Sequence, residues 1–223
     1  DEANRLHEQL LEAVAEADDD LMEKYLEGET LSEEEILFGL REGTLTGVFT
    51  AVLCGSATAN IGVRLLLDYI TVCLPSPIDK GIQIGVKPYT EEAVERRPSE
   101  DEPFSAMVFK TINDPYAGKL SLMRVYSGTL SGDTQVYNPN KDEKERIGNI
   151  LILEGKKQNA INLAAAGDII AVPKLKVTAT GDTLCELKNQ IMYEPLVPLK
   201  PIISFALEGK SKGDEDKIYT GLQ

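Results

Sequence analysis

The chain has 223 residues, of which 42% are hydrophobic, and its formal net charge at pH 7 is −14. This hydrophobic fraction is ordinary for a folded globular protein, and no apolar stretch approaches the roughly 20 residues that cross a bilayer, so we expect no membrane partner. The single histidine, His7, and three widely spaced cysteines argue against a zinc site or a histidine-based triad. The apolar surroundings of Cys54, Cys73 and Cys185 predict buried thiols and a cytoplasmic location.

The acidity is concentrated at the start of the chain. Residues 1–43 hold 15 of the 37 Asp and Glu residues but only 3 of the 23 Lys and Arg residues. Such a segment repels a phosphate backbone and suits a basic or amphipathic protein partner, so we expect no DNA partner.

Residues 3–26 are predicted to form one amphipathic helix, because apolar residues recur there at steps of three and four. A second stripe at the same spacing is acidic and includes Glu12, Glu16 and Asp19. Ser32 and Glu35 fit a capping box that begins a shorter helix, and Gly43 is expected to end it.

The pattern changes after residue 43. The apolar run Val48–Leu53 predicts a strand, and the small residues Cys54–Ala57 predict a turn out of it. Apolar residues between 63 and 74 then predict a helix that Pro75 ends. A strand, a turn and a helix in this order form half of a βαβ unit.

The middle of the chain is predicted to be an all-β domain. Residues 78–102 are polar and are predicted to be a linker that contains a short hairpin. Residues 103–192 are rich in strand-forming segments without an intervening helix, which favours a small closed barrel. The expected strands are Phe104–Thr111, Leu120–Tyr126, Thr134–Tyr137, Glu145–Leu153, Asp168–Val172 and Asp182–Leu187.

The segment at 124–139, RVYSGTLSGDTQVYNP, is predicted to contain two half-buried strands joined by a tight corner. Gly128 and Gly132 flank the corner, and glycine reaches positive φ without steric cost. Prolines at 195, 198 and 201 predict a second linker. After this linker we expect a strand at 202–207 and a helix from Asp214. Both chain ends fall inside expected elements, so we expect an internal piece of a longer protein.

Four stretches resemble elongation factor G, a translational GTPase, in the expected order. They are Leu21–Leu26, Cys54–Ala57 with Leu74–Pro77, Asp114–Tyr116 through Asn138–Lys141, and Gly181–Leu184. The resemblance covers essentially the whole chain and implies a multi-domain α+β protein. It implies a partial helical insert of the GTPase domain at 1–43, the last strand and helix of that domain at 44–80, a linker at 81–102, a second-domain β-barrel at 103–193, and the start of an α/β third domain at 194–223.

The resemblance also implies a guanine-binding loop at Ser56, Ala57 and Thr58, which serves GTP or GDP together with Mg²⁺ in the parent protein. The residues alone favour a plain strand-to-helix turn, and only the resemblance favours the guanine role in the parent protein. The phosphate loop, the switch segments and the base-selecting motif of GTPases do not occur in this sequence. We therefore expect a GTPase parent, whereas this chain alone should bind no nucleotide or metal and should contain no catalytic residue.

Two motifs imitate nucleotide-binding sites. Residues 204–211 end in Gly-Lys-Ser but lack the initial glycine of a phosphate loop, and Gly213 weakens the helix that should follow. Residues 140–143 imitate Asn-Lys-x-Asp but have Glu143 where aspartate is required. We interpret the first as a strand-end turn and the second as a solvated hairpin turn.

The resemblance implies a ribosomal partner on two surfaces. The insert helix would meet the ribosomal stalk protein through Glu12, Glu16 and Asp19, and the alternative is a merely solvated helix face. The barrel would contact ribosomal RNA over a small area, and the alternative is a structural spacer that rests on the GTPase domain. The RNA-contact candidates are Lys110, Lys119, Arg124, Lys141, Lys144 and Arg146. We expect a monomer.

The sequence thus predicts part of the factor that promotes tRNA and mRNA translocation. Departures from the family pattern at 154–162 and 208–213 keep open a paralogous translational GTPase of ribosomal protection or recycling. A non-enzymatic barrel module with an acidic arm is the alternative from another class, and the sequence upstream of residue 1 would discriminate between them.

Overall fold

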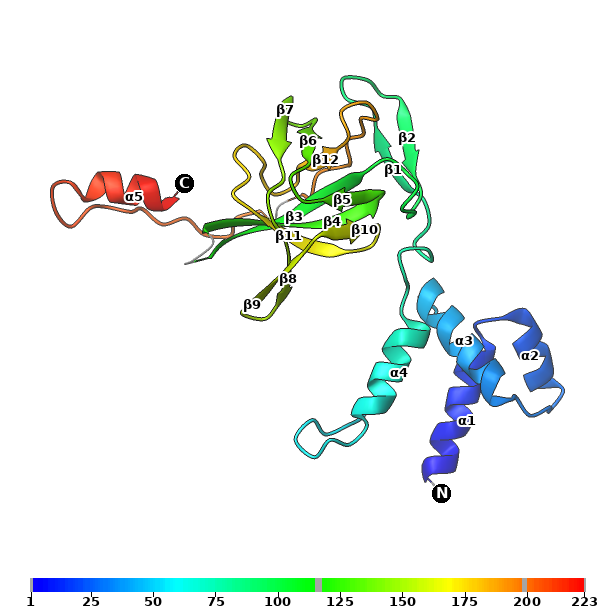
Figure 1. Ribbon diagram of the computed structural model, residues 1–223. Helices are drawn as coiled ribbons and strands as arrows, with labels where there is room; N and C mark the ends of the chain where they lie inside the picture. The colour runs from blue at the N-terminus through cyan, green and yellow to red at the C-terminus, as the bar shows by residue number, and fades with distance from the viewer. Residues whose placement is uncertain (1, 115–117, 198–199, 223) are drawn as a thin grey trace.

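The computed structural model describes residues 2–114, 118–197 and 200–222. Figure 1 shows a group of helices at the N-terminal end, a β-domain beside it, and an extended C-terminal arm with one helix on the far side. In the described ranges no helix combines the length and the apolar character needed to cross a bilayer. The predicted arrangement of helices followed by a β-domain is confirmed. Pro115 and Tyr116, which belong to the stretches of family resemblance, and the predicted linker residue Pro198 lie outside the described ranges.

The predicted single helix at 3–26 is wrong, because the structure has two helices, α1 (Glu2–Ala15) and α2 (Asp19–Leu26). Asp18 has an extended backbone, and its carboxylate accepts hydrogen bonds from the N–H groups of Asp20 (3.0 Å) and Leu21 (3.2 Å). An aspartate in this conformation caps a new helix rather than continuing the old one. The break turns Leu21 back onto Val14, and the two side chains form a small buried cluster with Leu31.

Helix α3 (Glu33–Thr46) begins with the predicted capping box. The Glu35 N–H donates to the Ser32 hydroxyl (3.3 Å), and the Ser32 N–H donates to the Glu35 carboxylate (2.8 Å). The helix continues past Gly43, which was expected to end it, and Gly47 with φ +76° is the left-handed C-cap. Gly43 instead allows close packing, because an added Cβ would lie 2.2 Å from the ring of Phe49.

The expected strand at Val48–Leu53 is absent. The segment has no regular secondary structure and joins no ladder among the described residues, and Val52 is 88% exposed. A β-strand needs a hydrogen-bonded neighbour, so an apolar run without a partner stays irregular. The predicted helix follows as α4 (Val63–Cys73). Cys54 is exposed, contrary to its predicted burial, whereas the other two cysteines are buried.

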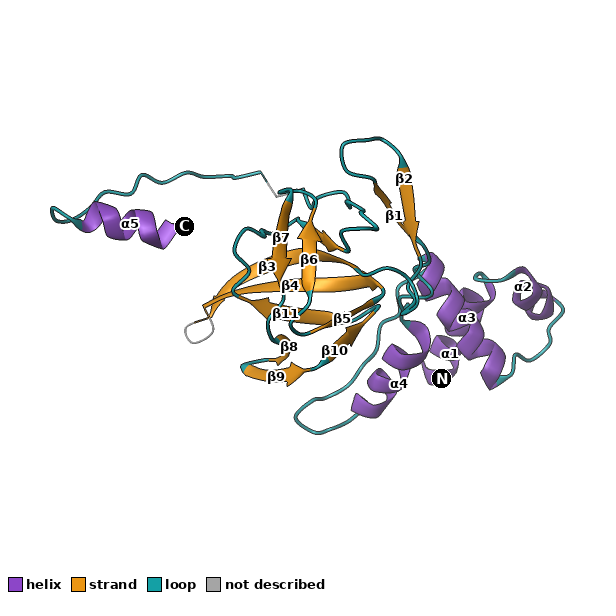
Figure 2. Ribbon diagram, turned by 45° about the horizontal axis from the view of Figure 1, so that its top comes forward, coloured by secondary structure: helices purple, strands orange, loops and turns teal. Residues whose placement is uncertain are grey.

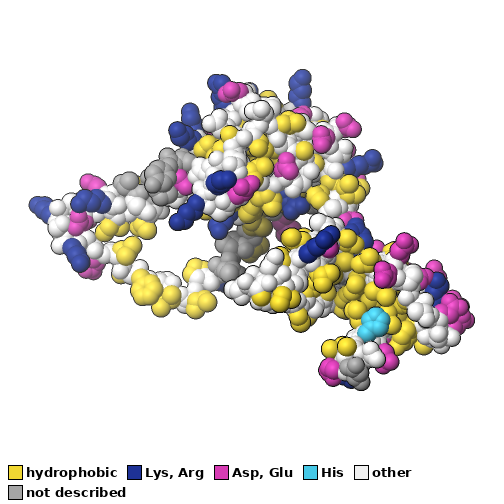
Figure 3. Space-filling model, turned by 60° about the horizontal axis from the view of Figure 1, so that its bottom comes forward, with side chains coloured by type: hydrophobic (Ala, Val, Ile, Leu, Met, Phe, Trp, Pro, Cys, Tyr) yellow, Lys and Arg dark blue, Asp and Glu magenta, His cyan; other side chains and the backbone are white. Residues whose placement is uncertain are grey.

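The helical group presents a largely apolar face. Figure 3 shows hydrophobic side chains gathered over the helices, with acidic side chains around their margin. The exposed apolar residues of this part include Leu6, Leu10, Leu53 and Leu66. The helices therefore bury only part of their apolar stripes against one another within the described residues.

The expected linker contains the hairpin of β1 (Gln83–Val86) and β2 (Ala93–Arg96), and this hairpin packs on the β-domain. Val86 and Met192 exchange backbone hydrogen bonds of 2.9 and 2.8 Å. The guanidinium of the buried Arg96 donates to the Asn189 carbonyl at 2.9 Å. Segments before and after the β-domain are thereby tied together.

The β-domain is an antiparallel, eight-stranded sheet in the order β7-β6-β12-β3-β4-β11-β8-β9, with a short β5–β10 pair beside it. The strands are β3 (Ser105–Asp114), β4 (Gly118–Ser127), β5 (Thr129–Ser131), β6 (Gln135–Asn138), β7 (Glu143–Arg146), β8 (Ile150–Glu154), β9 (Lys157–Ile161), β10 (Leu163–Ala165), β11 (Ile169–Pro173) and β12 (Thr183–Cys185). Figure 2 shows the sheet curling. One buried cluster takes residues from strands across the whole sheet, among them Val108, Met123, Val136, Ile170 and Leu184. The predicted barrel-like fold is confirmed.

Two details of the barrel differ from the prediction. The expected strand at Glu145–Leu153 is two strands, β7 and β8, with Ile147 between them. The two edge strands, β7 and β9, are not hydrogen-bonded to each other among the described strands. The sheet curls around one shared hydrophobic core, but no ladder closes it into a complete barrel.

The corner after β4 needs only one of its two glycines for conformational freedom. Gly128 has φ +69°, and an added Cβ would lie 2.5 Å from the Glu102 carbonyl oxygen. At the second bend Asp133, rather than Gly132, has positive φ (+59°). Aspartate tolerates this left-handed conformation better than most residues. The strands around the corner, β4 and β6, do not pair with each other.

The C-terminal arm lacks the strand expected at 202–207. Ile202 and Phe205 are almost fully exposed, and no described strand pairs with this segment. The predicted helix from Asp214 is confirmed as α5 (Asp214–Leu222), and Asp214 accepts hydrogen bonds from the N–H and the hydroxyl of Ser211.

Candidate functional site

The predicted guanine loop lies between the irregular segment at 48–55 and helix α4. Ser56 and Ile61 exchange backbone hydrogen bonds of 2.9 and 3.0 Å, and the Ser56 hydroxyl accepts from the Ala59 N–H at 3.3 Å. Ala57 and Thr58 are exposed at the tip. Small residues thus bring backbone to the surface beside a hollow of about 250 Å³. The geometry is compatible with a flat base and equally with a plain turn, so the guanine role stays a prediction.

The three acidic residues of the predicted stripe are exposed but do not share one helix. Glu12 is on α1, Glu16 follows the end of α1, and Asp19 is the first residue of α2. The helix break at Asp18 separates them, because the spacing rule holds only within a continuous helix.

A second acidic feature, which the sequence analysis missed, is a hollow of about 580 Å³ between α2 and α3. Lys24 donates a hydrogen bond to Glu35 there, which lowers the pKa of that carboxyl to about 2 with help from Ser32. Leu21 and Phe38 also line the hollow. The many acidic residues at 18–35 were the sequence signal for this feature. The hollow itself forms only when α2 packs against α3, so the sequence alone did not predict it. Its acidic members are Asp18, Asp20, Glu23, Glu27, Glu29 and Glu35.

The six predicted RNA-contact residues are divided among several places. Lys141, Lys144 and Arg146 are exposed together on the hairpin of β6 and β7. Arg146 lies 3.1 Å from Asp133 in an ion pair whose side chains are 76% and 82% exposed. An exposed pair of this kind contributes little and leaves the cation accessible.

The other three cations do not extend this group. Lys110 is exposed on β3. Lys119 on β4 is half-buried and donates to the Thr178 carbonyl at 2.8 Å, so its role in this structure is internal. Arg124, also on β4, lines a separate cavity beside residues 75–83. Of the predicted set, only the β6–β7 hairpin therefore forms a cluster.

A buried polar network fixes that hairpin. The Glu145 carboxylate is 3% exposed and accepts hydrogen bonds from the backbone N–H groups of residues 176–178 and from the Thr178 hydroxyl. Burial alone would raise the pKa of Glu145, but these donors outweigh it and hold the pKa below its ordinary value. The Asn138 amide donates to Asp182 (3.0 Å) and to Thr178 (3.2 Å). Because side chains alternate along a strand, Lys144 and Arg146 face solvent on either side of the inward Glu145.

The imitation of a base-selecting motif at 140–143 is a hairpin turn between β6 and β7, as predicted. Its Asp142 has φ +55° and accepts a 2.6 Å hydrogen bond from the Tyr137 hydroxyl. This hydrogen bond raises the pKa of Tyr137 to about 12. The aspartate is thus engaged in holding the turn.

Two comparisons with known proteins match this architecture. Residues 103–187 match the protein family described as elongation factor G domain 2. The chain is also similar to a solved crystal structure from Thermus thermophilus, with 28% sequence identity and a TM-score of 0.73. That match covers 98% of this chain and 30% of the solved chain, so the present chain spans less than a third of that protein's length. Residues 103–187 thus resemble the second domain of elongation factor G, and the chain shares its fold with part of the solved structure.

Proposed function

We propose that this chain is part of elongation factor G, the GTPase that promotes translocation of tRNA and mRNA on the ribosome. The observation that carries the proposal is the barrel of β3–β12, which lies in the range that matches elongation factor G domain 2. In this proposal GTP hydrolysis belongs to the parent protein, with GTP or GDP and Mg²⁺ as its ligands. The portion described here has a structural role and contacts the ribosome.

We propose that the β6–β7 hairpin is the RNA-contacting part of the barrel. Lys141, Lys144 and Arg146 are exposed there, and the buried Glu145 network fixes their backbone. Lys and Arg bind phosphate oxygens without regard to base sequence, so such a contact orients the domain and weakens with salt. The cluster is small, and affinity for the ribosome would come mainly from other parts of the parent protein.

We propose that the N-terminal helices bind the ribosomal stalk protein through Glu12, Glu16 and Asp19. The acidic hollow between α2 and α3 adds charge of the same sign and two apolar side chains, Leu21 and Phe38. Such a surface fits a basic, amphipathic segment, and its charges would speed the encounter more than they deepen affinity. Reversing the three acids to Lys in the parent protein should slow stalk-dependent stimulation of GTP hydrolysis, and unchanged rates at low salt would contradict this.

In the parent protein, Ser56, Ala57 and Thr58 would contact guanine through backbone groups at the exposed tip of their loop. The loop alone supplies no phosphate contact, so the proposal predicts no nucleotide binding by the present chain.

Two other functions remain as alternatives. A paralogous factor of ribosomal protection or recycling would have the same barrel, and it would support ribosome-stimulated GTP hydrolysis without translocation. A non-enzymatic barrel module with an acidic arm would have no phosphate loop or Asn-Lys-x-Asp motif encoded upstream of residue 1.

Ribosome co-sedimentation tests the proposal directly. The parent protein should sediment with ribosomes, and Lys144→Gln/Arg146→Gln should weaken this about fivefold or more at low salt, since each lost phosphate contact removes favourable counterion release. The matched control is Lys156→Gln/Lys157→Gln, which removes the same charge from the exposed β8–β9 turn. Equal binding of both double variants would refute a hairpin contact, and no binding by the unaltered parent protein would argue for the non-enzymatic module.

A further inference from the structure

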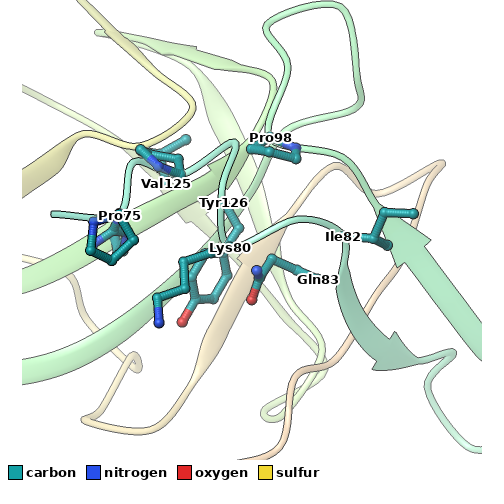
Figure 4. A pocket seen from close by; sticks show the side chains of 9 residues that line it. Pro75, Lys80, Ile82, Gln83, Pro98, Val125 and Tyr126 are labelled. Atoms are coloured by element: carbon teal, nitrogen blue, oxygen red, sulfur yellow. The ribbon is translucent and has the colours of Figure 1, made fainter. Parts of the chain in front are cut away.

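A cavity of about 680 Å³ lies where the segment between α4 and β1 crosses strand β4 (Figure 4). Figure 4 shows the side chains of Lys80 and Tyr126 extending in the same direction, with Gln83 nearby. The cavity has walls from parts of the chain that are distant in sequence. The segment contributes Pro75, Pro77, Lys80, Ile82 and Gln83, the stretch after β2 contributes Pro98, and β4 contributes Arg124, Val125 and Tyr126.

The lining of this cavity is positively charged in a strongly acidic protein. It includes Lys80 and Arg124 but neither Asp nor Glu, although the chain has 37 acidic and 23 basic residues. Within the described ranges neither cation forms an ion pair. Arg124 is only partly exposed, so its charge is partly removed from water without a counter-charge. Two unpaired cations in a recess favour an anion that enters it.

The remaining polar atoms also suit an anion. The Tyr126 hydroxyl contacts the Met107 sulfur at 3.9 Å, and a sulfur is a weak acceptor that leaves the hydroxyl available as a donor. The Tyr126 ring is fixed by a T-shaped contact with Tyr193, with ring centroids 4.9 Å apart. Tyr126 therefore needs little reordering to receive a ligand.

The opposite wall is held in place by its own contacts. Asp79 accepts hydrogen bonds from the N–H (2.7 Å) and hydroxyl (2.6 Å) of Ser76, and it pairs with Arg41 of α3 at 2.8 Å. Pro77 packs against Gly167 so closely that an added Cβ would lie 2.6 Å from the proline ring. Lys80 thus extends from an ordered turn, and an ordered site loses less entropy when it binds a ligand.

We propose that this cavity binds a small phosphate-bearing anion, which Lys80, Arg124 and the Tyr126 hydroxyl hold. The bound anion would connect the 75–83 segment to the barrel and fix the junction between the helices and the β-domain. The proposal assigns Arg124 to this site rather than to RNA contact, and it does not depend on the proposed function. A compact anion is favoured over an RNA strand because Arg124 is only partly exposed and lines a cavity with walls from several parts of the chain.

Calorimetric titration of the full chain with inorganic pyrophosphate, at constant ionic strength, tests the site. Saturable binding is expected, and Arg124→Gln or Lys80→Gln should each weaken it about tenfold, the scale of one lost charge-assisted hydrogen bond. The control Lys156→Gln removes a distant exposed charge and should leave affinity unchanged. Far-UV circular dichroism would verify that each variant is folded.

Three results would overturn the proposal. One is the absence of saturable pyrophosphate binding at concentrations up to about 10 mM, because a dissociation constant above this value corresponds to very weak binding. Another is equal weakening by the Lys156 control, which would indicate only general charge attraction. The third is binding of a single-stranded RNA hexanucleotide that Arg124→Gln abolishes while pyrophosphate does not bind, which would assign the residue to RNA. None of these results depends on ribosome co-sedimentation, so failure here is distinct from failure of the proposed function.

Discussion

Replacement of Glu145 should destabilise the barrel more than replacement of any neighbouring charge on β7. Its carboxylate accepts hydrogen bonds from Lys176 N (3.2 Å), Val177 N (2.8 Å), Thr178 N (3.0 Å) and the Thr178 hydroxyl (3.0 Å). In Glu145→Ala all four of these donors lose their shared acceptor together. A buried donor without an acceptor costs about 1–3 kcal/mol, and the losses are not additive, so we expect about 3–5 kcal/mol in total.

Two variants refine this prediction. Glu145→Gln keeps one carbonyl oxygen for the three closest donors but turns an amide N–H toward Lys176 N, so about 1.5–3 kcal/mol is expected. Glu143→Gln is the control on the same strand, where the side chain is exposed, and it should change stability by less than about 0.5 kcal/mol. Urea unfolding followed by far-UV circular dichroism measures all three, since the chain has no tryptophan.

The pH dependence of stability provides a second test with the same variants. The pKa of Glu145 is lowered from its ordinary 4.5 in the folded state, because its hydrogen-bond donors outweigh the effect of burial. Its ionised form therefore stabilises the fold fully above this ordinary pKa, and the contribution is lost as the pH falls through the lowered folded pKa. The stability difference from Glu145→Gln should shrink in that acidic range. A Glu145→Ala variant within about 0.5 kcal/mol of the control at pH 7 would refute the reasoning.

Three further predictions concern single residues and the nucleotide. Gly128→Ala should destabilise the chain by about 2 kcal/mol or more, because this glycine has a positive φ and an added Cβ would meet the Glu102 carbonyl. The control Gly148→Ala should change stability little, because nothing lies near its added Cβ. Equal unfolding midpoints for the two variants would contradict this prediction. Asp142→Asn should lower the pKa of Tyr137 from about 12 toward 10, which ultraviolet titration measures, and an unchanged high-pH tyrosine would argue against the hydrogen bond. In the unaltered chain the neutral Tyr137 stabilises the fold below about pH 10, and this contribution is lost as the pH rises toward 12. The isolated chain should show no micromolar binding of GDP by calorimetry, and such binding would contradict the expected lack of a phosphate site.

The barrel could be predicted from sequence because its signals are local. Strand-forming runs without intervening helices, and turn residues between them, indicated the all-β class and most strand positions. Strand β9 and the short pair β5–β10 were missed, because a polar strand such as Lys157–Ile161 has no apolar alternation to reveal it. The division of Glu145–Leu153 was missed because Ile147, which lies between β7 and β8, is buried like the inner residues of β8 and continues the strand-like apolar pattern.

The helical part shows where periodicity fails. The apolar spacing across 3–26 is continuous, yet Asp18 caps a new helix, since a short acidic side chain can hydrogen-bond its own following N–H groups. The segment Val48–Leu53 has the composition of a strand but no neighbour to pair with in the described ranges. In the first place a local hydrogen bond overrides the apolar spacing, and in the second the missing strand partner overrides the composition.

The candidate sites depended on tertiary structure even more. The sequence identified six cations without distinguishing their roles, and the fold separated an exposed hairpin group from the engaged Lys119 and the recessed Arg124. The acidic hollow between α2 and α3 needed the turn at Asp18. Each grouping joins residues that are far apart in sequence or on different elements, so spacing could not reveal it.

The most direct test of the account is GTP hydrolysis by the parent protein with and without ribosomes. We predict slow hydrolysis by the protein alone and strong stimulation by ribosomes, reduced by Lys144→Gln/Arg146→Gln but not by Lys156→Gln/Lys157→Gln. Hydrolysis that ribosomes do not stimulate, or a parent protein without GTPase activity, would contradict the assignment to a translational GTPase.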